Sequence, residues 1–322
     1  AGYDKTAFEK MLEIKGDSDY TKLIDMLTDL NDYSIGIEDV LKEHFDEENI
    51  VYWMAFQILM GNVDTQNRNV YLYSPLNSDI WYFIAWDNDG CLMRPEYELR
   101  NFSDQNSWEK GISNYWGNIL FQRCLKSRSF REKLNDAILD LREYLNKDML
   151  TSKIESYKNV LKPYLYLMPD AEYEPLTSEQ YDQIAASLPD EIEKNYQLYL
   201  ESLETPMPFY IGVPTIDGDK LKFNWDVSYD LDAEDITYSV EVAGDYLFRD
   251  VIYQNTTLTV PEAEMDLPKA GQYFVRVRAT NTSGKTQDAF DYYVTDEGKY
   301  YGMRCFYITE DSTVEEDDYE EG

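Results

Sequence analysis

Histidine and cysteine are scarce in this chain of 322 residues, which has one His and three Cys. Any Ser-His-Asp or Cys-His mechanism would need His44, and no Gly-x-Ser-x-Gly motif accompanies it. Cys91, Cys124 and Cys305 are widely spaced and form no Cys-x-x-Cys pair, so a zinc site is excluded, and their odd number argues against a disulfide framework. We therefore exclude these hydrolase classes and expect His44 to be an ordinary surface or helix-end residue.

Long apolar segments are also missing. No stretch reaches the roughly 18 apolar residues that a membrane-spanning helix needs, and the sequence shows no signal peptide. The chain starts with Ala1 and not with Met, so we expect it to be a fragment or a trimmed product of a longer protein.

Basic residues are few, with 29 Lys and Arg against 63 Asp and Glu and a net charge of −34. Such a charge repels nucleic acid and anionic lipid, which excludes DNA or RNA as partners and attachment to a surface through a basic patch. The acidity suits solubility, divalent cations or a basic protein substrate, and a solvated acidic surface is its simplest explanation. A hydrophobic content of 43% with 15% aromatic residues indicates a folded protein, long enough for two domains.

The most informative stretch is residues 55–90, AFQILMGNVDTQNRNVYLYSPLNSDIWYFIAWDNDG. It predicts an apolar helix that stops at Gly61, a polar loop over 62–69, and two aromatic strands over 70–73 and 80–85. The second strand runs directly into the motif Trp-Asp-Asn-Asp-Gly. Carboxylates and amides therefore lie just before the first strand and just after the second strand of a hydrophobic hairpin, where a metal ion and phosphate could bind.

Three residues in this stretch have the spacing of a phosphoryl-transfer site. A kinase needs an Asp that takes the acceptor hydroxyl's proton, an Asn five residues later that binds Mg²⁺, and an Asp after the next hairpin that binds metal and phosphates. Asp64, Asn69 and Asp87 are spaced in this way. The Asp-x-x-x-x-Asn spacing occurs three more times in the chain, so spacing alone leaves open that these acidic loops only cap a helix and a turn.

Three short motifs in the same stretch resemble those of the CotH (spore coat protein H) kinase family, and the resemblance covers about residues 45–203. The motifs are Gly-Asn-x-Asp at 61–64, Asn-x-Tyr-Leu-Tyr at 69–73 and Trp-Asp-x-Asp at 86–89. Two positions depart from the family pattern: Ala85 stands where Pro is usual, and Asn67 stands where a His is frequent.

The resemblance implies a role for each polar residue of the motifs. Asp64 corresponds to the catalytic Asp. Asn69 and Asp87 correspond to the residues that bind Mg²⁺ or Mn²⁺ together with ATP, and Asp89 is an acidic companion at the metal. Members of the family are secreted or surface-associated atypical protein kinases. The resemblance therefore implies a bacterial, extracellular or cell-surface protein that transfers phosphate from ATP to Ser or Thr of a protein substrate.

A kinase also needs an N-terminal lobe, with a loop over the phosphates and a Lys that binds them. No glycine-rich loop precedes Asp64, and the early lysines lie on predicted helices or loops: Lys5, Lys10, Lys15 and Lys22. We therefore expect this chain to be the C-terminal part of a CotH-like kinase that is inactive as this fragment. The alternative is a non-catalytic surface-attachment or structural protein.

The whole chain predicts an α+β multidomain fold. Residues 1–205 are expected to form a mostly helical lobe, like the C-terminal lobe of a kinase, in which the hairpin is the exception. Within it we expect a capping box that begins at Ser129, a helix that ends at Pro163, and one helix from Thr177 followed by a separate one. The motif Thr-Pro-Met-Pro at 205–208 predicts a stiff hinge.

Beyond the hinge, apolar and polar residues alternate with the period of strands. Residues 209–295 resemble a fibronectin type III sandwich, with Trp225 in its core and Tyr273 at its tyrosine corner. On the alternative function, this module would make the contacts with a surface partner. Residues 296–322 are expected to hold a short aromatic strand and an acidic tail too polar to order itself from Glu310 onward.

Overall fold

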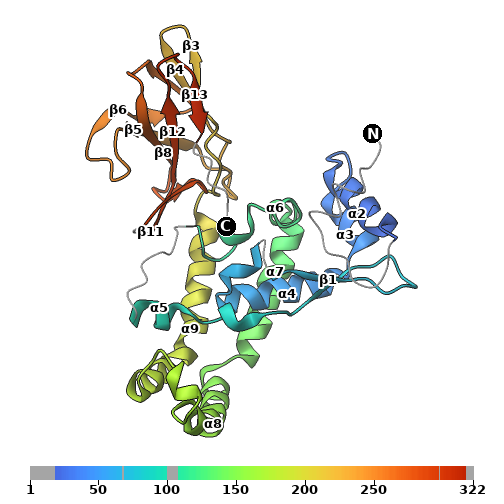
Figure 1. Cartoon of the computed structure of the whole chain (residues 1–322). Helices are drawn as coiled ribbons and strands as arrows, with labels where there is room; N and C mark the ends of the chain where they lie inside the picture. The colour runs from blue at the N-terminus through green and yellow to red at the C-terminus, as the bar shows by residue number, and fades with distance from the viewer. Residues whose placement is uncertain (1–18, 67–68, 100–107, 297, 317–322) are drawn as a thin grey trace.

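The structure is a computed structural model that describes residues 19–66, 69–99, 108–296 and 298–316 (Figure 1). A helical part comes first in the chain, and an all-β part follows it, so the predicted α+β class is confirmed. Several positions named above lie outside the described residues: Lys5, Lys10, Lys15, Asn67 and the last residues of the acidic tail, 317–322.

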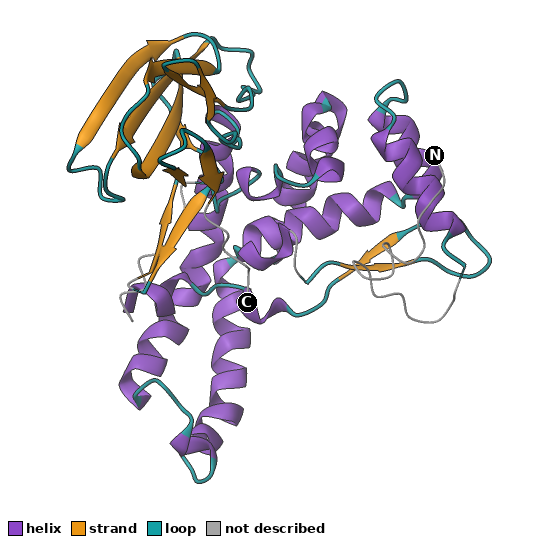
Figure 2. Cartoon of the chain, turned by 45° about the horizontal axis from the view of Figure 1, so that its top comes forward, coloured by secondary structure: helices purple, strands orange, loops and turns teal. Residues whose placement is uncertain are grey.

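Helix α4 lies at the centre of the helical part, packed against α7, α9 and a short β-hairpin (Figures 1 and 2). The α-helices are α2 (Thr21–Asn31), α3 (Ile37–His44), α4 (Glu47–Met60), α5 (Arg94–Leu99), α6 (Ile119–Lys126), α7 (Arg128–Tyr144), α8 (Lys147–Leu165) and α9 (Ser178–Glu204). The 3-10 helices are η1 (Val63–Gln66), η2 (Asn88–Gly90), η3 (Ser113–Tyr115) and η4 (Asp170–Glu172).

Helix α4 is apolar on nearly every side beyond its first turn, which is why it is buried. Ile50 and Leu59, near its two ends, have exposed fractions of 0%. Asp46 is its N-cap, with a carboxylate that accepts a hydrogen bond from the Asn49 amide at 2.9 Å. Gly61 ends the helix as predicted, with a left-handed φ of 61° that favours glycine. The chain therefore leaves α4 in a defined direction.

The predicted hairpin is present, with shorter strands than expected: β1 (Tyr71–Tyr73) and β2 (Tyr82–Ile84) pair antiparallel. Leu72 lies opposite Phe83 and shares its face of the ribbon. The Phe83 ring is buried against Trp53 of α4, with ring centroids 4.7 Å apart. Packing on α4 thus explains how a ribbon of two short strands is held in place.

For polar side chains of the helical part, the expectation for His44 is met in part and the one for Ser129 is wrong. His44 does stand at the end of α3, but it is buried, and its Nε2 lies 2.8 Å from the Asp29 carboxylate. The N-cap of α7 is Ser127 and not Ser129, because the Ser127 hydroxyl accepts from the Phe130 amide at 3.2 Å. Ser129 then falls inside the first turn, where no capping box can form.

Two predicted helix ends are also wrong. Helix α8 continues past Pro163 to Leu165, because a proline removes only the one helical hydrogen bond that its own N–H would have donated. The stretch expected to hold two helices is the single helix α9, which contains Pro189 and packs along α8. The start of α9 is as predicted, since Thr177 and Gln180 form a capping box.

The all-β part contains two antiparallel sheets. One has the order β3-β4-β7 and the other β13-β12-β8-β5-β6, with β9 beside β8; β10 and β11 form a separate hairpin. The strands are β3 (Thr215–Asp217), β4 (Lys220–Asn224), β5 (Ile236–Ala243), β6 (Val251–Leu258), β7 (Glu262–Asp266), β8 (Gly271–Asn281), β9 (Thr286–Asp288), β10 (Tyr292–Thr295), β11 (Gly298–Tyr301), β12 (Met303–Ile308) and β13 (Val314–Glu316).

Apolar side chains from both sheets form one core. Leu221 and Trp225 come from the β3-β4-β7 side, and Val240, Val277 and Phe306 come from the larger sheet. The predicted core position of Trp225 is confirmed, since 5% of it is exposed.

The β part extends beyond its expected end at residue 295. Strand β12 pairs with Gly271–Arg276, the first half of β8, and β13 pairs with β12. The expectation that the chain is disordered from Glu310 is therefore wrong for Val314–Glu316. The free N–H and C=O groups of an edge strand can pair with a polar segment and so order it. Composition alone does not reveal that such an edge is available.

The helical and β parts meet in a buried contact. Trp108 packs edge-on against Phe290, with ring centroids 5.1 Å apart, and Trp116 stacks on Tyr229 at 5.5 Å. The segment between the parts, expected to be a hinge, is buried from Thr205 through residue 208. It is therefore part of the packed interface and not an exposed linker.

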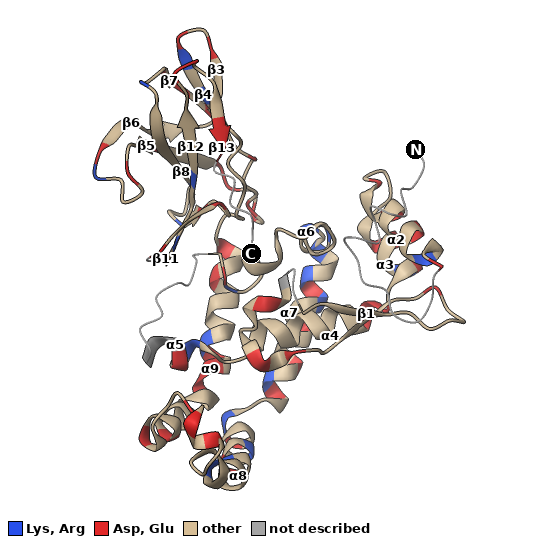
Figure 3. Ribbon diagram, viewed as in Figure 1, with Lys and Arg blue, Asp and Glu red and all other residues tan. Residues whose placement is uncertain are grey.

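None of the helices that the structure describes is long and apolar enough to cross a membrane. Acidic residues occur along both the helical and the β part of the chain (Figure 3).

Candidate functional site

Asp64 lies on η1, immediately after the end of α4, and its side chain is exposed. Its amide donates to the side-chain oxygen of Asn62 at 3.4 Å. The carbonyl of Met60, at the end of α4, accepts from the amide of Leu92 at 2.8 Å. Because Leu92 comes three residues after Asp89, this bond brings the segment with the later acidic residues to the same helix end as Asp64.

Asp87 and Asp89 lie where the chain leaves β2. Asp87 has a left-handed φ of 51°, and η2 follows it. The pKa of Asp87 is raised above its usual value of 3.8, first by the negative charge of Asp89, then by loss of hydration, by a hydrogen bond with Asp89 and by the charge of Asp64. The three carboxylates therefore lie close enough for their charges to interact.

Gly90 shows how closely the two acidic segments approach each other. A Cβ atom at this position would lie 3.0 Å from Asn62 Oδ1 and 3.0 Å from Asp64 Oδ2. Any side chain here would displace one of these groups. The glycine thus permits the approach of the Asp64 carboxylate to the segment that carries Asp87 and Asp89.

A network of three amide side chains joins the same segments beneath the carboxylates. Gln57 of α4 donates to Asn88 Oδ1 at 3.1 Å, and Asn62 donates to Gln57 Oε1 at 3.0 Å. Gln57 and Asn62 have exposed fractions of 0% and 2%. No role was predicted for these amides from the sequence. The available signal was that each acidic motif also contains an amide, in Gly-Asn-x-Asp and in Asp-Asn-Asp.

Residues of η3 hold η1 from the other side. The buried Tyr115 hydroxyl lies 2.9 Å from Thr65 Oγ1, which is next to Asp64. The neighbouring Asn114 donates from Nδ2 to the carbonyl of Val63 at 3.2 Å. Both contacts join residues about fifty positions apart in the chain, and no pattern in the sequence indicates them.

Asn69 stands just before β1, half-buried and with a left-handed φ of 53°. Tyr71, two residues later, pairs with Ile84, three residues before Asp87, so Asn69 and Asp87 flank the same end of the hairpin. Among the described residues, no hydrogen bond joins the Asn69 side chain to the three carboxylates. The backbone therefore brings Asn69 to the right end of the hairpin, while its part in metal binding stays a prediction.

The electrostatics of the site favour a cation. The charges that shift the pKa of Asp87 are those of Asp89 and Asp64, and both are negative. In the parts of the chain that the structure describes, no three His, Cys, Asp or Glu side chains are already arranged to hold a metal ion. Mg²⁺ needs no such cage, since it keeps several waters and binds through one or two carboxylates plus phosphates.

Cys91 follows this segment and is half-buried. The pKa of its thiol is raised to about 12, mainly by burial and also by the Asp89 and Asp64 charges, against a hydrogen bond with Asn62. A raised pKa disfavours the thiolate, which is the form in which a cysteine acts as a nucleophile.

The site thus combines a helical lobe built around an apolar helix with three neighbouring carboxylates at the mouth of a short hairpin. A family model described as CotH kinase protein matches residues 2–199. The chain belongs to this family, as its motifs predicted.

No curated protein matches the chain. Among solved structures, the chain is similar to "Structure of surface layer protein SbsC, domains 1-6", with a TM-score of 0.17 and 11% identity over 96% of this chain and 41% of that one. The chain therefore spans less than half the length of that structure.

Proposed function

We propose that this protein takes part in the transfer of phosphate from ATP to Ser or Thr of a protein substrate, with the catalytic centre at Asp64, Asn69, Asp87 and Asp89. The observation that carries the proposal is the closeness of the carboxylates. Asp64 follows a helix, Asp87 and Asp89 follow a hairpin, and the charges of Asp89 and Asp64 both act on Asp87. Neighbouring carboxylates of this kind support the pairing of a catalytic Asp with a metal-binding Asp, as phosphoryl transfer uses them.

Asp64 is the residue that accepts the proton of the acceptor hydroxyl. Its side chain is exposed, so a hydroxyl group can reach it from solvent. Its backbone is held by Asn62, and the neighbouring Thr65 is held by Tyr115. A carboxylate fixed in this way can orient a hydroxyl group before transfer, and this positioning is a large part of kinase catalysis.

Asp87 and Asn69 are the residues that would hold Mg²⁺ or Mn²⁺ with ATP, and Asp89 supports them. The donor set fits a hard cation, because it consists of carboxylate and amide oxygens with excess negative charge. The bound cation would neutralise charge on the phosphates. The chain's own contribution is to hold these oxygens at the hairpin mouth, through the amides of Gln57, Asn62 and Asn88.

Label transfer from γ-labelled ATP to a Ser- and Thr-containing protein tests the proposal, using a protein that includes this chain together with a nucleotide-binding lobe. Asp64→Ala and Asp87→Ala should each abolish transfer. The matched control is Asp79→Ala, an exposed Asp in the hairpin turn away from the site. Transfer that persists in Asp64→Ala and Asp87→Ala would refute the assignment.

For the β part we propose a fibronectin type III-like module and a place at the cell surface or outside the cell. The strand order supports the module, since β3-β4-β7 face a sheet in which β6, β5, β8 and β12 are neighbours. Tyr273 also donates from its hydroxyl to the Lys269 carbonyl at 2.9 Å, as a tyrosine corner does. Family membership supports the location. Localisation of the tagged protein by protease accessibility on intact cells tests it.

A further inference from the structure

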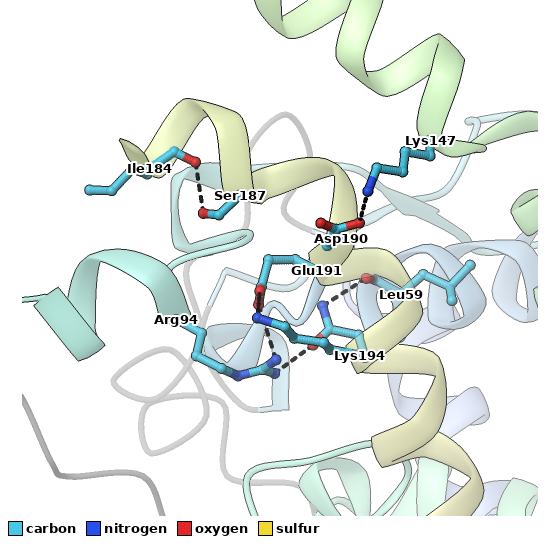
Figure 4. A network of polar contacts seen from close by, with 9 residues as sticks. Leu59, Arg94, Lys147, Ile184, Ser187, Asp190, Glu191 and Lys194 are labelled. Carbon is cyan, nitrogen blue, oxygen red and sulfur yellow. Dashed lines mark hydrogen bonds and ion pairs between the residues drawn. The ribbon is translucent and has the colours of Figure 1, made fainter. Parts of the chain in front are cut away.

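Helix α9 contributes two buried polar side chains, Glu191 and Asn195, that bond to Arg94. Figure 4 shows Arg94 and Glu191 facing each other. Arg94, the first residue of α5, donates to Glu191 Oε2 at 3.0 Å and to Asn195 Oδ1 at 2.6 Å. Glu191 and Asn195 have exposed fractions of 1% and 4%. Lys194 donates to the other oxygen of Glu191 at 2.6 Å, so this buried carboxylate is bonded on both sides.

Asn195 also contacts the other acidic segment. Its Nδ2 donates to the carbonyl of Leu59, in the last turn of α4, at 2.9 Å. That carbonyl has no partner within the helix, so the amide satisfies it. Gly61 lies against the same side chain, because a Cβ there would stand 2.7 Å from Asn195 Nδ2. The Asn195 side chain therefore links two segments: it donates to Leu59, shortly before Asp64, and accepts from Arg94, shortly after Asp89.

These residues form a contiguous wall beside the site. Arg94, Glu191 and Asn195 line one small pocket together with Asn62 and Gly90. The last two contact the Asp64 segment directly. The Arg94 group is therefore continuous with the groups that hold the carboxylates.

We infer that Asn195, with Arg94 and Glu191, sets the separation between Asp64 and the Asp87–Asp89 segment. They are positioning residues, and this role rests on the proposed function. A displaced Asn195 would release the end of α4, and Arg94 would lose one of its two acceptors. The carboxylates would then be held by the amide network, by the Leu92 amide and by the contacts of η3 with η1.

Two readouts test the inference on the chain as it stands: Mn²⁺ affinity, and amide hydrogen exchange over residues 61–65 and 88–92. The variants are Asn195→Ala and, as a milder change, Arg94→Lys, which keeps the charge beside Glu191. The control is Lys147→Ala, which breaks the Lys147–Asp190 pair on the same stretch of α9 (Figure 4). Both partners of that pair are more than half exposed, at 66% and 54%.

Asn195→Ala should weaken Mn²⁺ binding roughly tenfold, the usual effect of removing a group that orients metal ligands. Exchange should become faster at residues 61–65 and 88–92 but not in α7. Arg94→Lys should shift both readouts in the same direction by less, and Lys147→Ala should change neither. If Asn195→Ala fails to fold, Arg94→Lys carries the test.

The outcomes separate this inference from the proposed function. Unchanged exchange at both segments in a folded Asn195→Ala or Arg94→Lys variant overturns the inference. If the unaltered chain binds no Mn²⁺ but exchange in Asn195→Ala accelerates as expected, the positioning contact stands and the proposed function fails. Equal Mn²⁺ affinity in all variants, with Mn²⁺ bound by the unaltered chain, overturns the inference alone.

Discussion

The Asn49 side chain forms the two backbone hydrogen bonds with Phe83 that a neighbouring strand would otherwise form. Its Nδ2 donates to the Phe83 carbonyl at 3.1 Å, and its Oδ1 accepts from the Phe83 amide at 2.7 Å. A side chain in the first turn of α4 therefore satisfies both backbone groups of the central residue of β2. This contact fixes the hairpin, and with it Asp87, relative to the helix that leads to Asp64.

Asn49→Ala should destabilise the protein by about 2–3 kcal/mol, because two buried backbone groups lose their partners. The measurement is the free energy of unfolding from urea titration. The control is Asn77→Ala, at an exposed position in the hairpin turn, which should change stability by less than about 0.5 kcal/mol. Equal losses in the two variants would contradict this role for Asn49.

Tyr115→Phe removes only the hydroxyl that contacts Thr65. Thr65 keeps its second bond, from Oγ1 to the Asn62 carbonyl at 3.0 Å, so the cost should be about 1 kcal/mol. Because Thr65 adjoins Asp64, amide exchange should accelerate in η1 and stay unchanged in the β part. A variant with normal exchange in η1 would show that Tyr115 does not hold this segment.

Asp291 should make the stability of the protein depend on pH. Burial raises its pKa to about 6, although the Ile211 amide and Arg304 favour the charged form. The folded protein then binds the proton more tightly than the unfolded chain, so the stabilisation is complete below pH 3.8 and is lost as pH rises through 6. The size is about 3 kcal/mol.

Asp291→Asn removes this titration. The melting temperature of the variant relative to the unaltered protein should be higher at pH 7 than at pH 4. Measurement at these two pH values cancels the constant effect of the substitution on the Ile211 and Arg304 contacts. The same difference at both pH values would contradict the role of Asp291.

Tyr229 should couple the two parts of the chain. Its ring stacks on Trp116, and Lys126 Nζ lies 5.3 Å from the centroid of each ring. Tyr229→Ala should cost about 1–2 kcal/mol and split a single calorimetric transition into two. The control is Tyr157→Ala, at a side chain that is 62% exposed on α8. A single, unshifted transition in Tyr229→Ala would show that this contact does not couple the parts.

Local signals predicted the elements that carry the site. The apolar run and Gly61 indicated where α4 ends, and aromatic alternation indicated the hairpin. These features depend on a few neighbouring residues, which the sequence displays directly. The motifs around Asp64 and Asp87 also indicated the family correctly.

The contacts that hold the site could not be predicted in the same way. Asn195 reaches the end of α4 from 136 residues away, and Tyr115 reaches Thr65 from 50. Such partners are fixed by the packing of helices and leave no periodic pattern. The ordering of β13 has a similar cause, because an acidic segment takes its structure from the edge of β12 and not from its own composition.

Mn²⁺ titration of the chain, comparing Asp87→Ala with Asp79→Ala, tests the central claim most directly. The account predicts saturable binding that falls at least tenfold in Asp87→Ala and is unchanged in Asp79→Ala. Equal affinity in the two variants would mean that Mn²⁺ follows the net negative charge of the chain. That result would contradict a metal site at the mouth of the hairpin.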